Sequence, residues 1–154
     1  MPFTPFHFGP GALAKSVLRR HFSFALFVFT QIIVDCEPFY FLLTNDPPVH
    51  RFFHTYLGAN VIVLIGFFAG RPLIERLFKI RMTAAAALLS SAIGAYSHVV
   101  FDSLMHPDMR PLSPFSEANP LLGAVDLGML HGACLAAGAI GLALFWMRRK
   151  AGNS

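Results

Sequence analysis

The chain has 154 residues, of which 55% are hydrophobic and only 13% are charged, and its mean hydropathy is +0.58. Soluble domains carry about 25% charged residues, so this composition excludes disordered, coiled-coil and collagen-like chains and predicts a single integral membrane domain over residues 1–154. The net charge of +4 does not indicate nucleic-acid binding, because the basic residues stand in three short clusters between apolar runs rather than along one face.

Four apolar runs predict helices that cross the membrane. They cover residues 22–34, with a further apolar patch at 39–43, then 56–70, 82–101 and 121–147. A spanning helix needs about 20 residues. The third and fourth runs meet this length. The second meets it only if its helix starts near His50, and the first ends early at Asp35.

The segment before the first run predicts a short additional helix. From His7 to Arg19 is 12 residues, or about 18 Å of helix, and from Arg20 to Asp35 is 15 residues, or about 22 Å. A helical hairpin with its tip at the two arginines would return Asp35 to the level of His7. The alternative is a tail or interfacial helix over residues 1–18, which would leave His7 on the opposite side. The expected fold is therefore all-α, a polytopic membrane helical bundle of about four spanning helices plus a short N-terminal helix forming a hairpin with the first.

The distribution of charge predicts the orientation of this bundle. Ten of the twelve basic residues fall in three clusters at one predicted end: Lys15, Arg19 and Arg20; Arg71, Arg76, Lys79 and Arg81; Arg148, Arg149 and Lys150. The opposite end receives most of the acidic residues and only Arg51 and Arg110. By the positive-inside rule the N-terminal basic cluster and the C-terminus are expected in the cytoplasm, with the protein in the inner membrane of a bacterium.

Histidines and acids concentrate at the predicted non-cytoplasmic ends of the helices. His50 and His54 are four residues apart, as are His98 and Asp102, and on a helix that spacing places both side chains on one face. Asp35 ends the first run. Three segments thus deliver nitrogen and oxygen ligands to one layer, where buried polar groups indicate function. Imidazoles and carboxylates without thiolates suit a divalent ion, with Zn favoured and Mn or Fe as alternatives.

The remaining histidines and the cysteines have simpler interpretations. His21 stands beside the arginines of the hairpin tip and is expected at the cytoplasmic interface. His131 is expected to hydrogen-bond between helices, with an orienting role toward a ligand as the alternative. Cys36 and Cys134 form no metal-binding or CxxC pattern, so we interpret both as packing residues.

The order of these motifs is similar to that of a known family. The relevant stretches are His7, VDCE at 34–37, HRFFHT at 50–55, SHVVFDS at 97–103 and RPLSPFS at 110–116. They resemble the YdjM-like family of metal-dependent hydrolases of the inner membrane, some of which are under LexA control. That family has a histidine near its start, then PDxD-type, HRGxTHS, SHxxxD and PLxxPF-like motifs. The chain departs from this pattern at Phe52, where the family has glycine, and at Tyr56, where it has serine. The resemblance makes His7 part of the motif set.

Together the ligand layer and the resemblance predict a membrane-embedded metal-dependent hydrolase. One or two ions would be held by His7, Asp35, His54, His98 and Asp102, with His50 as a further ligand or orienting group. Glu37 is the expected general base, and His106 the expected acid or contact to a substrate phosphate. Arg51 and Arg110 would hold an anionic head group, so the expected partner is a membrane lipid, such as a lipid phosphoester, or another amphiphilic substrate.

Three other functions compete with this prediction. A metal or proton transporter would extend the site inward through Asp126 and His131, but residues 135–147 are almost entirely apolar. A haem protein would use His54 and His98 as axial ligands, which leaves the neighbouring carboxylates unexplained. A membrane scaffold would use the polar residues only to pair helices.

Overall fold

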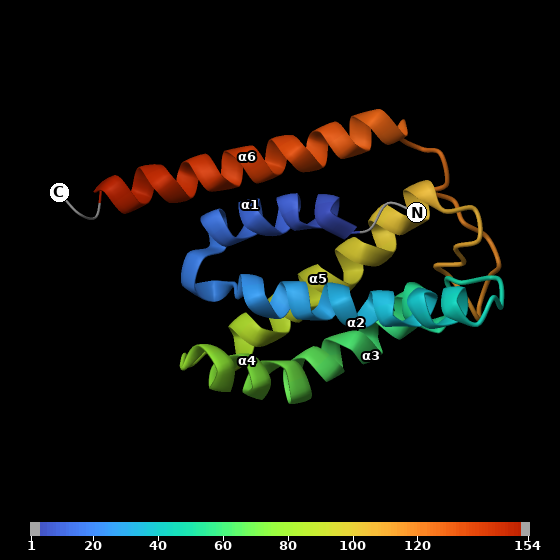
Figure 1. Cartoon of the computed structure of the whole chain (residues 1–154), viewed down its shortest axis with the longest axis horizontal. Coiled ribbons are helices and arrows are strands. Elements are labelled where there is room, and N and C mark those ends of the chain that lie inside the picture. The colour runs from blue at the N-terminus through green and yellow to red at the C-terminus, as the bar shows by residue number, and fades with distance from the viewer. Residues whose placement is uncertain (1–3, 152–154) are drawn as a thin grey trace.

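The computed structural model describes residues 4–151 and is helical, with no strand in that range (Figure 1). Six α-helices make up most of it: α1 (Phe8–Leu18), α2 (Phe24–Leu43), α3 (Tyr56–Ile65), α4 (Arg71–Phe78), α5 (Ala84–Met105) and α6 (Leu127–Ala151). Short 3-10 turns are η1 (Thr4–His7), η2 (Arg19–His21) and η3 (Phe52–His54), and η4 (Gly66–Gly70) is a π-helical turn that joins α3 to α4. The expected all-α bundle is confirmed.

Four helical segments are long and apolar enough to cross a membrane. They are Phe24–Leu43, Tyr56–Phe78, Ala84–Met105 and Leu127–Ala151. The second reaches spanning length because α3, η4 and α4 follow one another without a break. The sequence predicted that the span is lengthened at its beginning, near His50. It is instead lengthened at its other end, by η4 and α4.

The sequence predicted that the first span ends at Asp35, but the helix continues beyond this residue. Helix α2 begins after Ser23, whose side chain accepts a hydrogen bond from the backbone N–H of Leu26 at 3.3 Å, and it continues through Pro38 to Leu43. The apolar patch at 39–43 is thus the last part of the same helix. The prediction was wrong because carboxylates in an apolar run indicate the end of a span only when they lack partners, and Asp35 and Glu37 both have histidine partners inside the bundle.

The second span begins later than expected, which changes the local structure of two histidines. Thr55 caps α3, its hydroxyl accepting a hydrogen bond from the backbone N–H of Gly58 at 2.9 Å. His50 and His54 therefore precede the helix, the latter in η3, and are not an i,i+4 pair on a helix face. Similarly, α6 starts at Leu127 rather than at 121, because Asp126 accepts a hydrogen bond from the N–H of Met129 at 3.1 Å.

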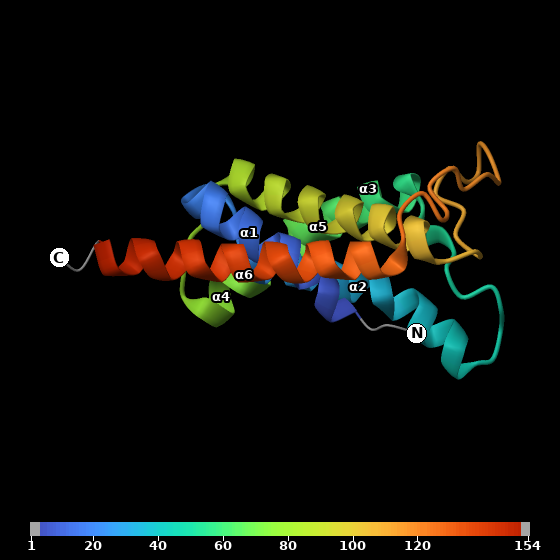
Figure 2. The same ribbon diagram turned by 90° about the horizontal axis from the view of Figure 1, so that it is seen from above.

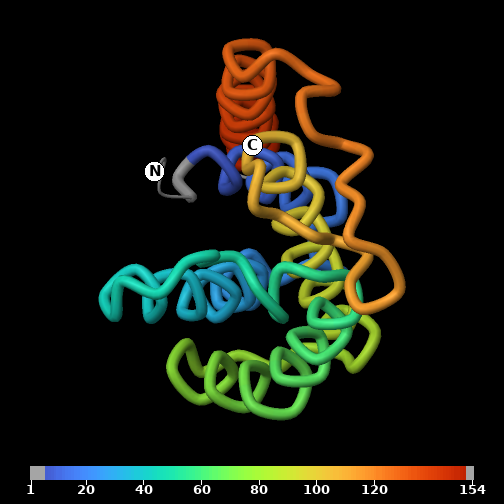
Figure 3. The backbone as a smooth tube through the Cα atoms, turned by 90° about the vertical axis from the view of Figure 1, so that its right-hand side faces the viewer, coloured from blue at the N-terminus to red at the C-terminus, as the bar shows by residue number. Residues whose placement is uncertain are grey.

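The N-terminal hairpin is present and lies inside the bundle. The chain turns at η2 after α1 and returns as α2, which lies beside α1 (Figure 1). The most extensive contacts of α1 are with α6. Seen along the bundle, α6 and α1 stack above α2, and α3 with α4 lie below (Figure 3). A Cβ on Gly9 would overlap the carbonyl oxygen of Cys134, and one on Gly141 would lie 2.6 Å from the backbone nitrogen of Leu13. Glycines thus allow α1 and α6 to meet backbone to backbone.

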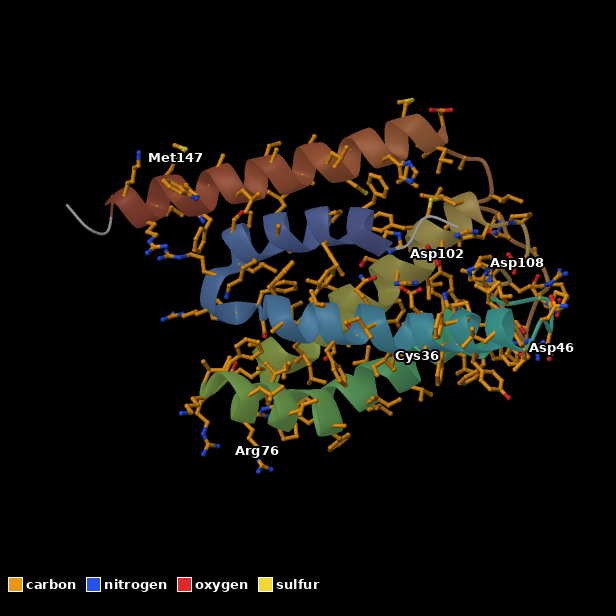
Figure 4. The ribbon with its side chains drawn as sticks, viewed as in Figure 1. Cys36, Asp46, Arg76, Asp102, Asp108 and Met147 are labelled. Carbon is orange, nitrogen blue, oxygen red and sulfur yellow. The ribbon has the colours of Figure 1, made fainter. Side chains whose placement is uncertain are left out.

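The two ends of the bundle differ in composition. The long connections 44–55 and 106–126 gather at one end (Figure 2). Asp46 and Asp108 lie at this end, whereas Arg76 lies near the opposite end (Figure 4). This arrangement agrees with the predicted separation of acidic and basic residues, and we call the two ends the loop end and the basic end.

Candidate metal centre

Four side chains from three segments converge inside the bundle. Asp35 comes from α2, His54 from η3, and His98 and Asp102 from α5, and one ligand atom from each lies within 4.8 Å of the others. Both imidazoles are fully buried, and Asp102 is 5% exposed. The i,i+4 spacing of His98 and Asp102 on α5 is as predicted, so one helix face carries two of the four ligands.

The nitrogens that face this cluster are the Nε2 atoms of the two buried histidines. His98 Nε2 lies 3.2 Å from Asp35 Oδ1 and 3.2 Å from Asp102 Oδ2. His54 Nε2 lies 3.5 Å from Asp102 Oδ2. Neither nitrogen has a hydrogen-bond partner among the described residues, although both are buried. Buried nitrogens without hydrogen bonds, beside carboxylates, form a donor set that a divalent cation satisfies.

A buried glutamine fixes the orientation of His98. The Nδ1 of His98 lies 2.5 Å from Gln31 Oε1. The amide nitrogen of Gln31 donates to the carbonyl oxygen of Gly94 at 3.1 Å, which fixes the amide so that its oxygen faces the imidazole. Since an amide oxygen only accepts, Nδ1 of His98 carries a proton, and Nε2 is the nitrogen that faces Asp35 and Asp102. Gln31 was not predicted from the sequence; the available signal was a lone amide one helical turn before Asp35.

Glu37 contacts Nδ1 of His54, as Gln31 contacts Nδ1 of His98. Its Oε2 accepts hydrogen bonds from the backbone N–H groups of Arg51 at 3.1 Å and Phe53 at 3.0 Å, and it lies 3.4 Å from Nδ1 of His54. The carboxylate therefore ties the end of α2 to the turn that carries this histidine. Contacts of this kind fix the tautomer and ring orientation of metal-ligating histidines.

A second group of possible ligands adjoins the first and shares one member with it. His50, Asp102 and His106 place one ligand atom each within 4.8 Å of one another. The rings of His50 and His106 stack with centroids 4.4 Å apart. Asp108 holds the other side of His50, both of its oxygens lying 2.9 Å from Nδ1. Asp102 is the one residue common to the two groups.

Protonation of the second group follows from its surroundings. Burial, followed by the neighbouring His54, lowers the pKa of His50, so its imidazole is neutral near pH 7. Burial is the largest single influence and raises the pKa of Asp108, but the contacts to His50 and the backbone N–H hydrogen bonds together outweigh it, so the pKa is lowered. The pair thus presents a neutral imidazole held by a carboxylate. Asp108 was not among the predicted site residues, and its distance from the i,i+4 motifs explains why.

The hairpin brings His7 to the edge of the cluster. Its Nε2 lies 3.5 Å from Asp102 Oδ1, and its ring packs edge-on against His98 with centroids 4.9 Å apart. It is buried, yet it belongs to neither group of mutually close ligand atoms. Burial, together with the adjacent His98, lowers the pKa of His7 to about 4, so this imidazole is also neutral near pH 7.

Arg51 and Arg110 line a pocket of about 350 Å³ beside the second group, which His50 and Asp108 also line. Each arginine has an acidic partner at the rim: Arg51 lies 2.9 Å from Asp46, and Arg110 lies 3.0 Å from Glu117. All of these residues lie at the loop end. The pocket therefore adjoins the second group through His50 and carries both arginines that the sequence assigned to this end.

His131, His21 and the two cysteines lie outside both ligand groups. His131 was expected to hydrogen-bond between helices; its buried Nε2 has no hydrogen-bond partner among residues 4–151, and its ring stacks on Phe6 at 4.2 Å. His21 is exposed in η2, as expected for an interfacial residue. Cys134 is buried and Cys36 is exposed, so only the former fits the predicted packing role.

Comparison with known proteins finds no relative of this chain. No family model, no curated protein and no solved structure matches the chain.

Proposed function

We propose that this protein is a membrane-embedded metal-dependent hydrolase with two adjacent ion positions that share Asp102. The observation that carries the proposal is the pair of buried Nε2 atoms of His54 and His98, which face two carboxylates without a hydrogen-bond partner in the described chain. Leaving such groups unsatisfied is costly, and a divalent ion would satisfy both at once.

The alternative, a scaffold in which histidines and acids only pair helices, requires protons on the Nε2 atoms. The Gln31 amide keeps a proton on Nδ1 of His98, so a further proton on Nε2 would make this buried imidazole a cation. A neutral imidazole protonated at Nδ1 has only a lone pair to offer at Nε2. Two carboxylates facing a lone pair repel it, whereas a cation between them is attracted to all three groups. A neutral His98 therefore favours a metal ion, whereas a doubly protonated His98 would pair with both carboxylates, and elemental analysis distinguishes the two.

The residues have distinct roles in this proposal. Asp35, His54, His98 and Asp102 hold the first ion, and His50, Asp102 and His106 hold the second; His7 supplements them at Asp102. A bound divalent ion would polarise a phosphoryl or acyl oxygen and activate water for hydrolysis. Glu37 was predicted as a general base, but its oxygen is engaged by two backbone N–H groups and His54, so we assign it a positioning role. His106 is assigned as a ligand in place of the predicted acid.

The pocket beside the second group supports an amphiphilic substrate with an anionic head. Arg51 and Arg110 line it together with apolar side chains such as Phe52 and Leu57, both of which are exposed. A phosphate could exchange for the rim carboxylates as the partner of these arginines. We therefore propose a lipid phosphoester as the substrate class. Zinc is the proposed ion, because its preferred ligands are those present. The assignment to a YdjM-like family and the inner-membrane orientation remain part of this proposal.

Elemental analysis tests the metal centre directly. Wild type, His98→Ala and His21→Ala would be purified in detergent without chelators, and zinc, manganese and iron would be measured per chain. We expect near-stoichiometric metal in wild type and in His21→Ala, whose changed residue lies outside the cluster, and a strong loss in His98→Ala. Equal metal content in all three proteins, or its absence from all three, would refute the site. Hydrolysis of lipid phosphoesters by the loaded wild type would then test the reaction.

A further inference from the structure

A second pocket lies at the basic end, at the turn between α4 and α5. It has a volume of about 430 Å³ and is lined by Pro72, Glu75, Arg76, Lys79, Ile80 and Arg81. Arg76 marks its position in Figure 4, at the end of the bundle away from Asp102 and Asp108. The pocket therefore shares no residue with the candidate metal centre and is not explained by the proposed hydrolase activity.

Three cations and a single carboxylate line this pocket. Arg76, Lys79 and Arg81 form no ion pair within residues 4–151. The single acidic residue of the lining is Glu75, and its Oε1 is already engaged by the backbone N–H of Met82 at 2.8 Å and by Nε of Arg71 at 3.3 Å. The carboxylate thus stabilises the turn, and the lining has three cations against this one anion.

The backbone of the turn holds these cations around one hollow. Lys79 adopts the left-handed conformation with φ 52° and ends α4. The N–H groups of Lys79 and Ile80 both donate to the carbonyl oxygen of Glu75, which closes the turn tightly. Arg71 also donates a hydrogen bond to the carbonyl oxygen of Met82 at 2.8 Å, which connects the start of α4 to the residues just before α5. The cationic side chains are therefore presented from a fixed frame rather than from a loose loop.

Apolar side chains surround the same turn. Leu73, Leu77, Phe78 and Ile80 are all exposed, and they continue the apolar surface of the second span to the edge of the pocket. A ligand that fits both features has an anionic head and an apolar body. The membrane itself supplies such molecules, and basic pockets beside spanning helices are recognised binding sites for anionic lipid head groups.

We propose that this pocket binds the phosphate head group of an anionic phospholipid, with its acyl chains lying along α4. Arg76 and Arg81 provide planar guanidinium groups suited to phosphate oxygens, and Lys79 adds a compact positive charge. The site would be a structural lipid site, separate from the substrate pocket at the loop end.

The test compares two triple variants that lose the same charge at the same end. Arg76→Gln, Lys79→Gln and Arg81→Gln would be combined in one protein, and Arg20→Gln, Arg149→Gln and Lys150→Gln in the control. Both would be reconstituted with wild type in nanodiscs that contain phosphatidylcholine and phosphatidylglycerol, and lipids retained after release would be counted by native mass spectrometry. We expect the pocket variant to retain phosphatidylglycerol about tenfold less than wild type and control.

Equal loss in both triple variants would overturn the proposal, because it would mean general attraction of anionic lipid to a basic surface. Full competition by inorganic phosphate or glycerophosphate would overturn it as well, since the site would then take a soluble anion. A variant with Arg76→Lys and Arg81→Lys keeps the charge and should retain most of the bound lipid, which separates recognition from misfolding. Metal content should be unchanged in all variants, so the result is independent of the proposed hydrolase.

Discussion

Nδ1 of His98, on α5, lies 2.5 Å from the side-chain oxygen of Gln31, on α2. Because the amide nitrogen of Gln31 is held by the carbonyl oxygen of Gly94, the glutamine cannot turn its other face to the imidazole. This contact determines which nitrogen of His98 is free for a metal. It leaves Nε2 as the nitrogen of His98 that faces Asp35 and Asp102.

Replacement of Gln31 by leucine should weaken metal binding without removing a ligand. The change deletes the acceptor for His98 Nδ1, and loss of such an orienting contact lowers metal affinity about 10–100-fold. Gln31→Glu retains the acceptor and should keep more of the affinity. Titration of both variants with zinc against a competing chelator would measure the difference. Wild-type affinity in Gln31→Leu would show that the amide has no role in the site.

Asp102 and His106 should differ in how many ions their loss removes. Asp102 belongs to both ligand groups, whereas His106 belongs to the second alone. Asp102→Ala should therefore abolish binding at both positions, and His106→Ala should remove one ion at most. The metal-to-protein ratio, measured after loading with excess zinc and desalting, decides the matter. A full wild-type ratio in His106→Ala would limit the centre to the first position.

Gly58→Ala should damage the site although it touches no proposed ligand. A Cβ there would overlap the carbonyl oxygen of Phe52 and lie 2.8 Å from Cα of Phe53, so the turn that carries His54 must move. Overpacking of this kind costs about 1–3 kcal/mol. We expect lower thermal stability in detergent and reduced metal content. Gly132→Ala is the control, because nothing lies within 4 Å of its added Cβ; similar losses in both variants would contradict the interpretation.

The loop end and the basic end should lie on opposite sides of the membrane. Single cysteines would be introduced by Glu117→Cys and Lys79→Cys in a background that lacks Cys36 and Cys134. The positive-inside rule predicts that a membrane-impermeant maleimide labels the first in intact cells and the second only after lysis. The reverse pattern would place the metal centre in the cytoplasm and exclude the orientation proposed here.

Local periodicity predicted the parts of the protein that depend on neighbours in sequence. The apolar runs indicated four spans, and the spacing of His98 and Asp102 correctly placed both on one helix face. The same spacing was misleading for His50 and His54, because Thr55 starts the helix only after them. Their rings nevertheless lie 4.8 Å apart, held by the turn and by contacts to Glu37 and Asp108.

Other parts of the site depend on tertiary contacts that no short motif encodes. Gln31 is the one amide side chain in an apolar run, and its importance arises only when α2 packs on α5. Asp35 resembled a helix terminus because a carboxylate inside a span is costly unless it has a partner. Its partner, His98, is far along the chain, so the continuation of α2 could not be predicted from the local sequence.

The close packing of α6 on α1 bears on the order in which the protein matures. His7 immediately precedes α1, and α6 packs mainly against α1 and contributes no residue to either ligand group. Ribosomes deliver α1 first among these helices and α6 last, so the N-terminal hairpin lacks its main neighbour until translation has passed Gly141. The other proposed ligands can assemble on α2, η3 and α5 before then. Secure placement of His7 would accordingly be a late event in biogenesis, completed when α6 docks.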